Sequence, residues 1–385
     1  MRQFLVGAKL FTGEETLAGR GVLVEDGRIA ALLPEAADTG AGTVVLPEGS
    51  LIVPGFIDTQ ANGGGGVLVN DDASGPALAR MVEAHRRFGT TGLLPTVITD
   101  TPERMRLAAD GVADAALEPG SGILGVHLEG PFISLERKGI HDARLIRPVE
   151  AADLAFLTGL AARLGPARLL LSVAPETVGD DVLRQLKSAG LVLAAAHSAA
   201  TAERTFEAVA AGITGFTHLF NAMPPIAGRQ PGIAAAALAD PGTWCGIIAD
   251  GFHVHPLTLK LALGAKPRGR VFLVTDAMPP LGTEAESFTL YGATIHRRGG
   301  RLVDDQGTLA GADLDMAAAV RNAVRLLGVS LEEALRMASL YPASFLGLDL
   351  SHGRIAPGYA ADLALLTGEV KVAGTWIGGA WRSAE

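Results

Sequence analysis

Apolar segments alternate with helical patterns through the middle of the chain, and this alternation constrains the fold more than any other feature. Eight short apolar runs have the character of buried strands, and most are followed by a stretch with helical periodicity. Continuous apolar strands that alternate with amphipathic helices are typical of a parallel sheet. The expected strands are 51–58, 92–97, 123–128, 168–173, 191–196, 213–218, 244–249 and 271–275, and the clearest helices are 76–88, 102–117, 149–163, 200–211 and 256–263.

Eight such units predict a (β/α)8 TIM-like barrel, a fold of the α/β class. A doubly wound open sheet is the alternative for the same alternation. That alternative lacks its usual support, because no G-x-G-x-x-G follows the first expected strand. The glycine run 63–66 provides backbone freedom rather than a dinucleotide fingerprint.

Both ends of the chain have the pattern of short β-strands. Near the N-terminus the expected strands are 4–6, 21–24 and 28–32, with a hairpin turn at 25–27, and near the C-terminus they are 362–366, 370–375 and 377–381. Neither group alone is enough for a stable sheet. We therefore expect residues 1–50 and 351–385 to form one small β-domain together, with the barrel in residues 51–350.

The composition limits the partners and the compartment of the chain. Of the 385 residues, 48% are hydrophobic, which allows a sizeable core, and the net charge is −9 without a dominant cluster of lysine and arginine. Nucleic acids and anionic membranes are therefore poor partners. No apolar run reaches the about 18 residues of a membrane span, and the N-terminus is too briefly apolar for a signal peptide. The single cysteine, Cys245, cannot form an internal disulfide, so we expect a buried thiol and a cytoplasmic protein.

Three residues of the metal-ligand type stand where expected strands end. Glu129 follows the third strand, His197 the fifth and His218 the sixth. The C-terminal strand ends of a barrel share one face, and one glutamate with two histidines is a ligand set of a catalytic zinc that keeps an open position for water. The alternatives are a salt-bridged glutamate and core or capping histidines. His127, two residues before Glu129, fits a satisfied core histidine better than a ligand.

Asp276 ends the eighth expected strand and is the candidate for moving protons to and from a metal-activated water. A helix N-cap or turn residue is the alternative. Many metal-dependent barrel hydrolases have His-x-His after the first strand, whereas this chain has Gln60 and Asn62, whose amides are weak metal ligands. The fourth strand also lacks a lysine for a carbamate bridge. We therefore expect one divalent ion, with zinc as the chemical default, and no second metal.

Three more candidates lie in loops that follow expected strands. His141 comes after the third strand, His253 after the seventh, and Arg229 lies in a Gly/Pro-rich loop after the sixth. Charged and polar side chains in loops are usually solvated, but the loops at this face of a barrel carry its active site. We therefore expect functional roles for both histidines, and an arginine in such a loop can clamp a phosphate with two hydrogen bonds.

The motifs around these residues resemble the amidohydrolase superfamily, and within it the N-acetylglucosamine-6-phosphate deacetylase family. HLEGPF together with HLFNAM is the most specific part, and the match spans nearly the whole chain. The matching segments are 53–58 (VPGFID), 127–132 (HLEGPF), 138–141 (KGIH), 218–223 (HLFNAM), 228–232 (GRQPG), 250–254 (DGFHV), 274–277 (VTDA) and 309–311 (LAG).

The resemblance implies a distorted barrel, a β-sandwich built from both termini, and a homodimer. It implies that Glu129, His197 and His218 hold the metal. It also implies that Asp276 accepts and donates the proton and that His141 contacts the acetyl carbonyl. The implied substrate-binding residues are Ile140, His141, Asn221, the backbone of Ala222, His253, Leu309, Ala310, Gly311 and Arg229, the last reaching the active site of the neighbouring subunit.

The implied reaction is hydrolysis of the acetamide of N-acetyl-D-glucosamine 6-phosphate to acetate and D-glucosamine 6-phosphate, in amino-sugar catabolism and recycling. Gln60 and Asn62 resemble the one-metal branch of the family, whereas other members keep His-x-His and bind two ions. The rival enzymes act on N-acetylgalactosamine 6-phosphate or, like a dihydroorotase, on cyclic amides, and the missing strand-four lysine disfavours the latter. The non-enzymatic rival is a barrel that only senses amino-sugar phosphates, and the intact acid/base argues against it.

Overall fold

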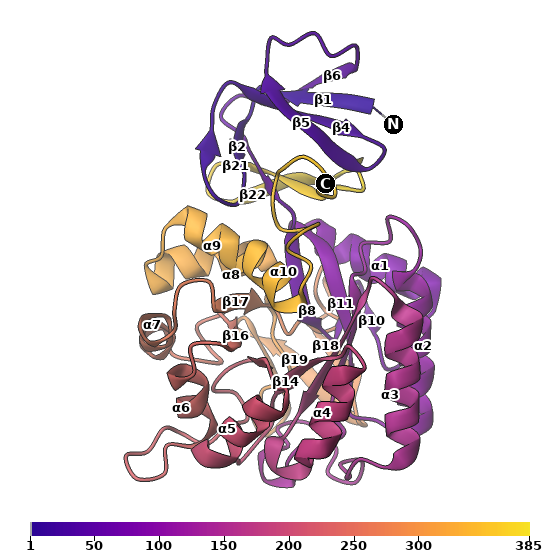
Figure 1. The fold of residues 1–385 in the computed structure, drawn as a ribbon, viewed down its shortest axis with the longest axis vertical. Helices are drawn as coiled ribbons and strands as arrows, with labels where there is room; N and C mark the ends of the chain where they lie inside the picture. Colours follow the sequence, from indigo (N-terminus) through magenta and orange to yellow (C-terminus); the bar gives the residue numbers. More distant parts are fainter. Residues whose placement is uncertain (1) are drawn as a thin grey trace.

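The computed structural model describes residues 2–385 and contains a barrel beside a smaller β-region that holds both termini (Figure 1). The barrel wall is one parallel sheet in the order β8-β11-β12-β13-β14-β15-β16-β17. Its strands are β8 (Phe56–Ala61), β11 (Thr90–Ile98), β12 (Gly125–Glu129), β13 (Arg168–Val173), β14 (Val192–Ala195), β15 (Gly215–Phe216), β16 (Trp244–Ile248) and β17 (Val271–Val274). This sequential order confirms the predicted (β/α)8 barrel, because the order of a doubly wound sheet reverses.

The last barrel strand returns to the first. The backbone N–H of Asp276 donates to the carbonyl of Gln60 at 2.9 Å, and Ala61 and Ala277 form a parallel bridge. These contacts lie at the C-terminal end of β8 and just beyond that of β17. They bring the two ends of the sheet together at the same face as the predicted active-site residues.

Helices surround the barrel (Figure 1), and the sequence starts several of them with a side-chain cap. The hydroxyls of Thr101, Thr201 and Ser330 each accept from a backbone N–H three residues later. The helices are α1 (Gly75–Arg86), α2 (Pro102–Ala116), α3 (Ala151–Leu164), α4 (Asp180–Ser188), α5 (Ala202–Ala211), α6 (Gly232–Ala239), α7 (Pro256–Ala265), α8 (Met316–Asn322), α9 (Leu331–Ala338) and α10 (Leu340–Leu346), with short turns η1 (Leu135–Arg137), η2 (Pro175–Thr177) and η3 (Ala323–Leu327).

The limits of the first predicted strand, 51–58, are wrong because this segment contains the whole of one strand and the beginning of the next. β7 (Leu51–Pro54) pairs with β2 and β21 in the terminal β-region, whereas β8 begins at Phe56 in the barrel. Gly55 joins them at a crowded point, where an added Cβ would lie 1.9 Å from Oγ1 of Thr91. The predicted domain limits themselves, 1–50 with 351–385 and 51–350, stay a prediction.

Strands from both termini form two sheets with a shared core. A four-stranded sheet has the order β5-β4-β1-β6, and a six-stranded sheet has the order β23-β22-β21-β7-β2-β3. Side chains from both sheets, including Leu5, Val22, Leu363 and Trp376, form one buried cluster. This arrangement confirms the expected β-sandwich. Its other strands are β1 (Arg2–Val6), β2 (Lys9–Phe11), β3 (Thr16–Leu17), β4 (Arg20–Glu25), β5 (Arg28–Pro34), β6 (Gly42–Val45), β21 (Leu363–Thr367), β22 (Lys371–Ile377) and β23 (Ala380–Ser383).

A small antiparallel sheet follows the last barrel strand, and the sequence patterns did not predict it. It contains β18 (Ser287–Leu290), β19 (Ala293–Arg298) and β20 (Arg301–Val303). A separate two-stranded hairpin, β9 (Gly63–Gly64) and β10 (Val67–Leu68), follows β8. Leu290 and Ile295 share a buried apolar cluster with Leu68 and Ile98. This cluster ties the three-stranded sheet, called the inserted sheet below, to the β9–β10 hairpin and to the C-terminal end of β11. None of the helices within residues 2–385 is long and apolar enough to cross a membrane.

Candidate active site

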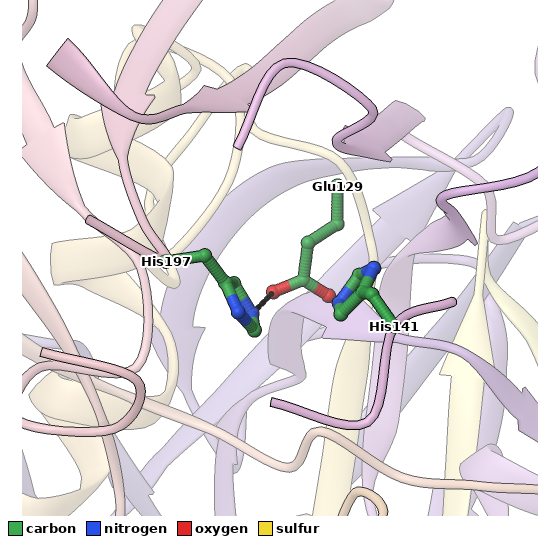
Figure 2. A group of neighbouring side chains, drawn as sticks. All are labelled: Glu129, His141 and His197. Atoms are coloured by element: carbon green, nitrogen blue, oxygen red, sulfur yellow. Dashed lines mark ion pairs between the residues drawn. The ribbon is translucent and has the colours of Figure 1, made fainter. Parts of the chain in front are cut away.

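Glu129, His197 and His218 converge at or just after the C-terminal ends of β12, β14 and β15. Oε1 of Glu129 lies 2.8 Å from Nε2 of His218 and 3.3 Å from Nε2 of His197, and the two Nε2 atoms are 3.1 Å apart. All three side chains are buried. Figure 2 shows His197 facing one oxygen of the Glu129 carboxylate and His141 beside the other.

The backbone turns sharply at three of the predicted site residues. His197, His218 and Asp276 have φ angles of 46°, 32° and 53°. Residues other than glycine adopt this left-handed conformation at a cost of about 1–3 kcal/mol, and it persists only where the surroundings impose it. Each of the three follows a barrel strand by two residues, so the turns direct these side chains into one cavity at the mouth of the barrel.

The three convergent side chains fit a divalent metal ion. Nδ1–H of His197 donates to the carbonyl of Arg137 at 2.9 Å, which leaves the lone pair on Nε2 for a cation. Ligand atoms bonded to a tetrahedral ion at about 2.0–2.1 Å lie roughly 3.3 Å from one another. The observed separations of 2.8–3.3 Å approach that value. A cation would also offset the cost of burying the carboxylate.

Electrostatics at the convergent group favour an ionised glutamate. Burial opposes the charge on Glu129, but hydrogen bonds from His197 and His218 outweigh it and hold the pKa of Glu129 well below its usual range. Burial likewise opposes a charge on His218, but Glu129 raises the pKa of that ring. Nδ1 of His218 is buried and has no hydrogen-bond partner within residues 2–385. The carboxylate therefore attracts positive charge to this point.

Asp276 lies beside the group, and two amides hold it. Nδ2 of Asn62 donates to Oδ1 of Asp276 at 2.6 Å, and Nε2 of Gln60 donates to the same atom at 3.2 Å and to Oε1 of Glu129 at 3.2 Å. Burial, and then the charge of Glu129, raise the pKa of Asp276 to about 6. The N–H groups of Gln60 thus donate to both carboxylates, and those of Asn62 donate to Asp276.

His141 stands on the other side of Glu129. Its ring lies edge-on to His197 with the centroids 4.5 Å apart, and its ligand-type atoms lie within 4.8 Å of those of Glu129 and His197. This proximity makes Glu129, His141 and His197 a second possible ligand trio. His218 has the shorter contacts, 2.8 Å to Glu129 and 3.1 Å to His197, so its position agrees with the predicted ligand set of Glu129, His197 and His218. Burial, and then the charge of His197, lower the pKa of His141 to about 3, so this ring is neutral.

A cavity of about 240 Å³ opens beside these side chains. Arg229 is absent from it: this exposed residue lies in a separate groove with Arg137 and Gly232. Ala310 does not line the cavity either, and it is buried in the apolar cluster that includes Leu290, Ile295 and Leu302 of the inserted sheet. The predicted residues that line the cavity are Glu129, Ile140, His141, His197, His218, Asn221, Ala222, His253, Asp276, Leu309 and Gly311.

Two residues that the sequence patterns did not single out contact site histidines. Oγ1 of Thr99 lies 2.8 Å from Nδ1 of His141, and Oδ2 of Asp250 lies 2.6 Å from Nδ1 of His253. Asp250 precedes His253 by three residues, so the DGFHV segment carried a local signal for that pair. Thr99 is 42 residues from His141, and no local spacing could indicate that contact.

His127 is a satisfied core histidine, as its position suggested. One ring nitrogen lies 3.1 Å from Oγ1 of Thr96, and the other lies 2.8 Å from Oγ of Ser172. Both partners are buried hydroxyls from neighbouring barrel strands. Neither ring nitrogen is left for a metal.

Comparisons with known proteins agree over almost the whole chain. Residues 51–382 match the model of the Amidohydrolase family. The chain is 40% identical to the N-acetylgalactosamine-6-phosphate deacetylase of Shewanella sp. (strain ANA-3), over 97% of this chain and 94% of that protein. It is 35% identical to the N-acetylglucosamine-6-phosphate deacetylase of Haemophilus influenzae, over 99% and 100%. The crystal structure of N-acetylglucosamine-6-phosphate deacetylase from Pasteurella multocida aligns with a TM-score of 0.94 at 34% identity and covers 100% of both chains.

Proposed function

We propose a function from one premise: the chain belongs to the amidohydrolase family. The protein hydrolyses the acetamide of N-acetyl-D-glucosamine 6-phosphate to acetate and D-glucosamine 6-phosphate, in the cytoplasm and in amino-sugar catabolism and recycling. The observation that carries this proposal is the convergence of Glu129, His197 and His218 beside Asp276 in one cavity. The relatives named above have sugar-phosphate deacetylase activities in their names, which supports the substrate class.

One metal ion per subunit would be held by Glu129, His197 and His218, and zinc suits one carboxylate with two imidazoles. When bound, such an ion lowers the pKa of a water ligand to about 7 and polarises a carbonyl oxygen. Gln60 and Asn62 direct N–H groups toward the carboxylates of Glu129 and Asp276. We therefore propose that this chain binds one ion rather than two.

Asp276 would move the proton. Its Oδ1 already accepts from Asn62 and Gln60, so Oδ2 is the atom that takes a proton from the attacking water. The same atom then delivers the proton to the departing amine nitrogen, so that acetate and the free amine leave. The raised pKa of Asp276, about 6, suits a group that must both accept and donate near neutral pH.

His141 would stabilise the charge that develops on the acetyl oxygen. With Nδ1 held by Thr99, Nε2 is the ring nitrogen that remains for the cavity. A neutral ring with its proton on Nε2 donates a hydrogen bond to that oxygen without adding a charge beside the metal ligands. Donors of this kind, fixed before the reaction, typically contribute about 10²–10³ in kcat.

The phosphate requires a cation that the cavity of one subunit does not supply. No lysine or arginine belongs to its lining within the described residues 2–385, although four histidines do. We propose a homodimer in which Arg229 of one subunit reaches the phosphate in its partner's site. Three exposed apolar side chains lie within a few residues, along the sequence, of Arg229 or of other residues that line its groove. They are Leu135, Phe206 and Ile226, and a second copy of the chain would cover them.

N-Acetyl-D-galactosamine 6-phosphate is the second candidate substrate, because the relative at 40% identity carries that activity in its name. The two sugars differ only in the configuration at C4, far from the acetamide. Relative kcat/KM values for the two epimers would therefore identify the physiological class. A value for the galactosamine compound more than about 10-fold higher, or about 1.4 kcal/mol in transition-state binding, would replace our first choice.

Acetate release tests the proposed function directly. The purified protein, loaded with zinc, should release acetate from N-acetyl-D-glucosamine 6-phosphate, lose this activity after chelation and regain it when zinc is returned. The metal content should follow the activity at one ion per subunit. Undiminished activity in fully metal-free protein would contradict the proposal, and so would a metal-loaded protein that binds the sugar phosphate without hydrolysis.

A further inference from the structure

We propose that Thr99 is a positioning residue for amide hydrolysis: its hydroxyl holds the ring of His141 so that Nε2–H faces the acetyl oxygen. This inference rests on the proposed function, because the acetyl oxygen belongs to the proposed substrate. Thr99 itself does not line the cavity. Thr99 follows β11 directly and is fully buried. It lies behind His141, and its side chain is 2.8 Å from the ring.

The surroundings of Thr99 fix its position from several sides. The hydroxyl of Tyr291, in the inserted sheet, donates to the carbonyl of Thr99 at 2.5 Å. Oγ1 of Thr99 lies 3.3 Å from the backbone carbonyl of Glu129, next to the metal-ligand side chain. At Gly130 an added Cβ would lie 2.1 Å from the same Oγ1, so a side chain at that position would displace the hydroxyl. Thr99 therefore connects β11, the end of β12 and the inserted sheet to one imidazole.

The single hydroxyl proton of Thr99 has two possible acceptors, and the choice decides the tautomer of His141. If the hydroxyl donates to Nδ1 of His141, the neutral ring carries its proton on Nε2. If it donates to the Glu129 carbonyl, Nδ1–H donates to Thr99 and Nε2 presents a lone pair, as a metal ligand does. The contact to Nδ1 is 2.8 Å and the contact to the carbonyl is 3.3 Å. The 2.8 Å contact suits either direction of donation, but 3.3 Å exceeds the usual range of about 2.5–3.0 Å for an O–H···O hydrogen bond. The hydroxyl proton therefore belongs to the contact with Nδ1, which is the first arrangement.

This arrangement gives His141 the role that the chemistry requires. An oxyanion needs a donor, and only the tautomer with the proton on Nε2 offers one to the cavity. Loss of the Thr99 hydroxyl would leave Nδ1 without its partner, so the proton could occupy either nitrogen and the ring could rotate. Substrate binding, which uses other residues of the cavity, would change less than the chemical step.

The test compares Thr99→Val, which has nearly the same shape but no hydroxyl, with Thr99→Ser, which keeps the hydroxyl. Each variant is prepared with zinc bound, and metal content, kcat and KM are measured. ¹⁵N NMR of histidine-labelled protein reports which ring nitrogen carries the proton, and the spectrum of His141→Gln identifies the signals of His141. If T99V does not fold, Thr99→Ala takes its place, because alanine also lacks the hydroxyl and adds no bulk.

We expect T99V to keep its metal and its KM within about 2-fold while kcat falls about 10- to 100-fold, a part of the effect of losing an oxyanion donor. The His141 signals should change from the Nε2–H tautomer to a mixture, and T99S should restore both kcat and tautomer. An unchanged tautomer in T99V would overturn the inference, as would metal loss with unchanged kcat per bound ion. A wild-type protein that releases no acetate would refute the proposed function. The NMR comparison of wild type and T99V would still show whether the Thr99 hydroxyl determines which ring nitrogen of His141 carries the proton.

Discussion

Asp276 has a backbone conformation that few residues tolerate, and asparagine is one of those few. A substitution by asparagine therefore tests the carboxylate without disturbing the backbone. Its φ of 53° lies in the left-handed region, which asparagine and aspartate adopt more readily than other residues. Asp276→Asn should therefore fold and retain one metal ion per subunit. It should lose about 10²–10⁴ in kcat, because an amide cannot carry the proton. Metal analysis and acetate release measure the two effects.

Asp181→Asn is the matched control for this experiment, because Asp181 is a fully exposed aspartate on α4. It should leave kcat unchanged. An Asp276→Asn enzyme with activity near that of the control would remove Asp276 from the mechanism. Loss of the metal from Asp276→Asn would instead indicate that this carboxylate is a ligand.

Residues whose signal is local could be predicted from the sequence, and residues whose role depends on folding could not. Glu129, His197 and His218 each interrupt the end of an apolar run, so their types and positions were informative. The contact between Thr99 and His141 spans 42 residues, and only the parallel pairing of β11 and β12 brings them together. The carbonyl of Arg137 that orients His197 is a backbone group and leaves no trace in the sequence.

At the scale of elements, the same limit explains the error at the first barrel strand. β7 and the first two residues of β8 are apolar and are separated by Gly55 alone, so the sequence has the pattern of one strand. Their separation depends on partners more than 30 residues away: β7 pairs with β21, and β8 pairs with β11. The inserted sheet β18–β20 escaped prediction for a different reason. Its strands are short and partly exposed, so they lack the continuous apolar character of the barrel strands.

The attachment of α1 to β9 makes stability depend on pH. His85 of α1 is buried, and its Nε2–H donates to the carbonyl of Gly63 at 2.9 Å. Burial lowers the pKa of His85 from 6.5 to about 4, so the folded state keeps a neutral ring where the unfolded chain binds a proton. The free energy of unfolding should therefore fall as pH drops from 6.5 toward 4, by about 3 kcal/mol from this residue. Above pH 6.5 the contribution is complete and constant.

Denaturant unfolding of the wild type and of His85→Gln at each pH isolates this contribution. The stability difference between the two proteins should shrink as the pH falls, because glutamine does not titrate, and other buried histidines affect both proteins equally. A difference between wild type and His85→Gln that stays constant from pH 7 to 4 would show that the folded ring accepts a proton as easily as the unfolded one.

At the scale of the whole molecule, the charge of the cavity predicts how substrates depend on Arg229. The cavity lining contains no arginine or lysine within residues 2–385, so in the proposed dimer a dianionic phosphate would gain most from the Arg229 of the second subunit. Arg229→Ala should reduce kcat/KM for the phosphorylated substrate by about 10²-fold or more, equivalent to a lost charged hydrogen bond of about 3 kcal/mol. It should change the slow hydrolysis of unphosphorylated N-acetylglucosamine much less. Equal losses on both substrates would assign Arg229 to folding or assembly.

Mixed dimers test whether Arg229 acts across the interface. Homodimers of Asp276→Asn and homodimers of Arg229→Ala should each retain about 1% of wild-type activity or less. In a mixed dimer, one site combines the intact Asp276 of the Arg229→Ala subunit with the intact Arg229 of its partner. Random pairing should restore roughly a quarter of wild-type activity, because half of the dimers are mixed and one of their two sites is complete. The background activity is measured by mixing Asp276→Asn subunits with subunits that carry both Asp276→Asn and Arg229→Ala, because no complete site can form in that mixture. If activity stays at that background although mass spectrometry confirms mixed dimers, Arg229 does not act across the interface.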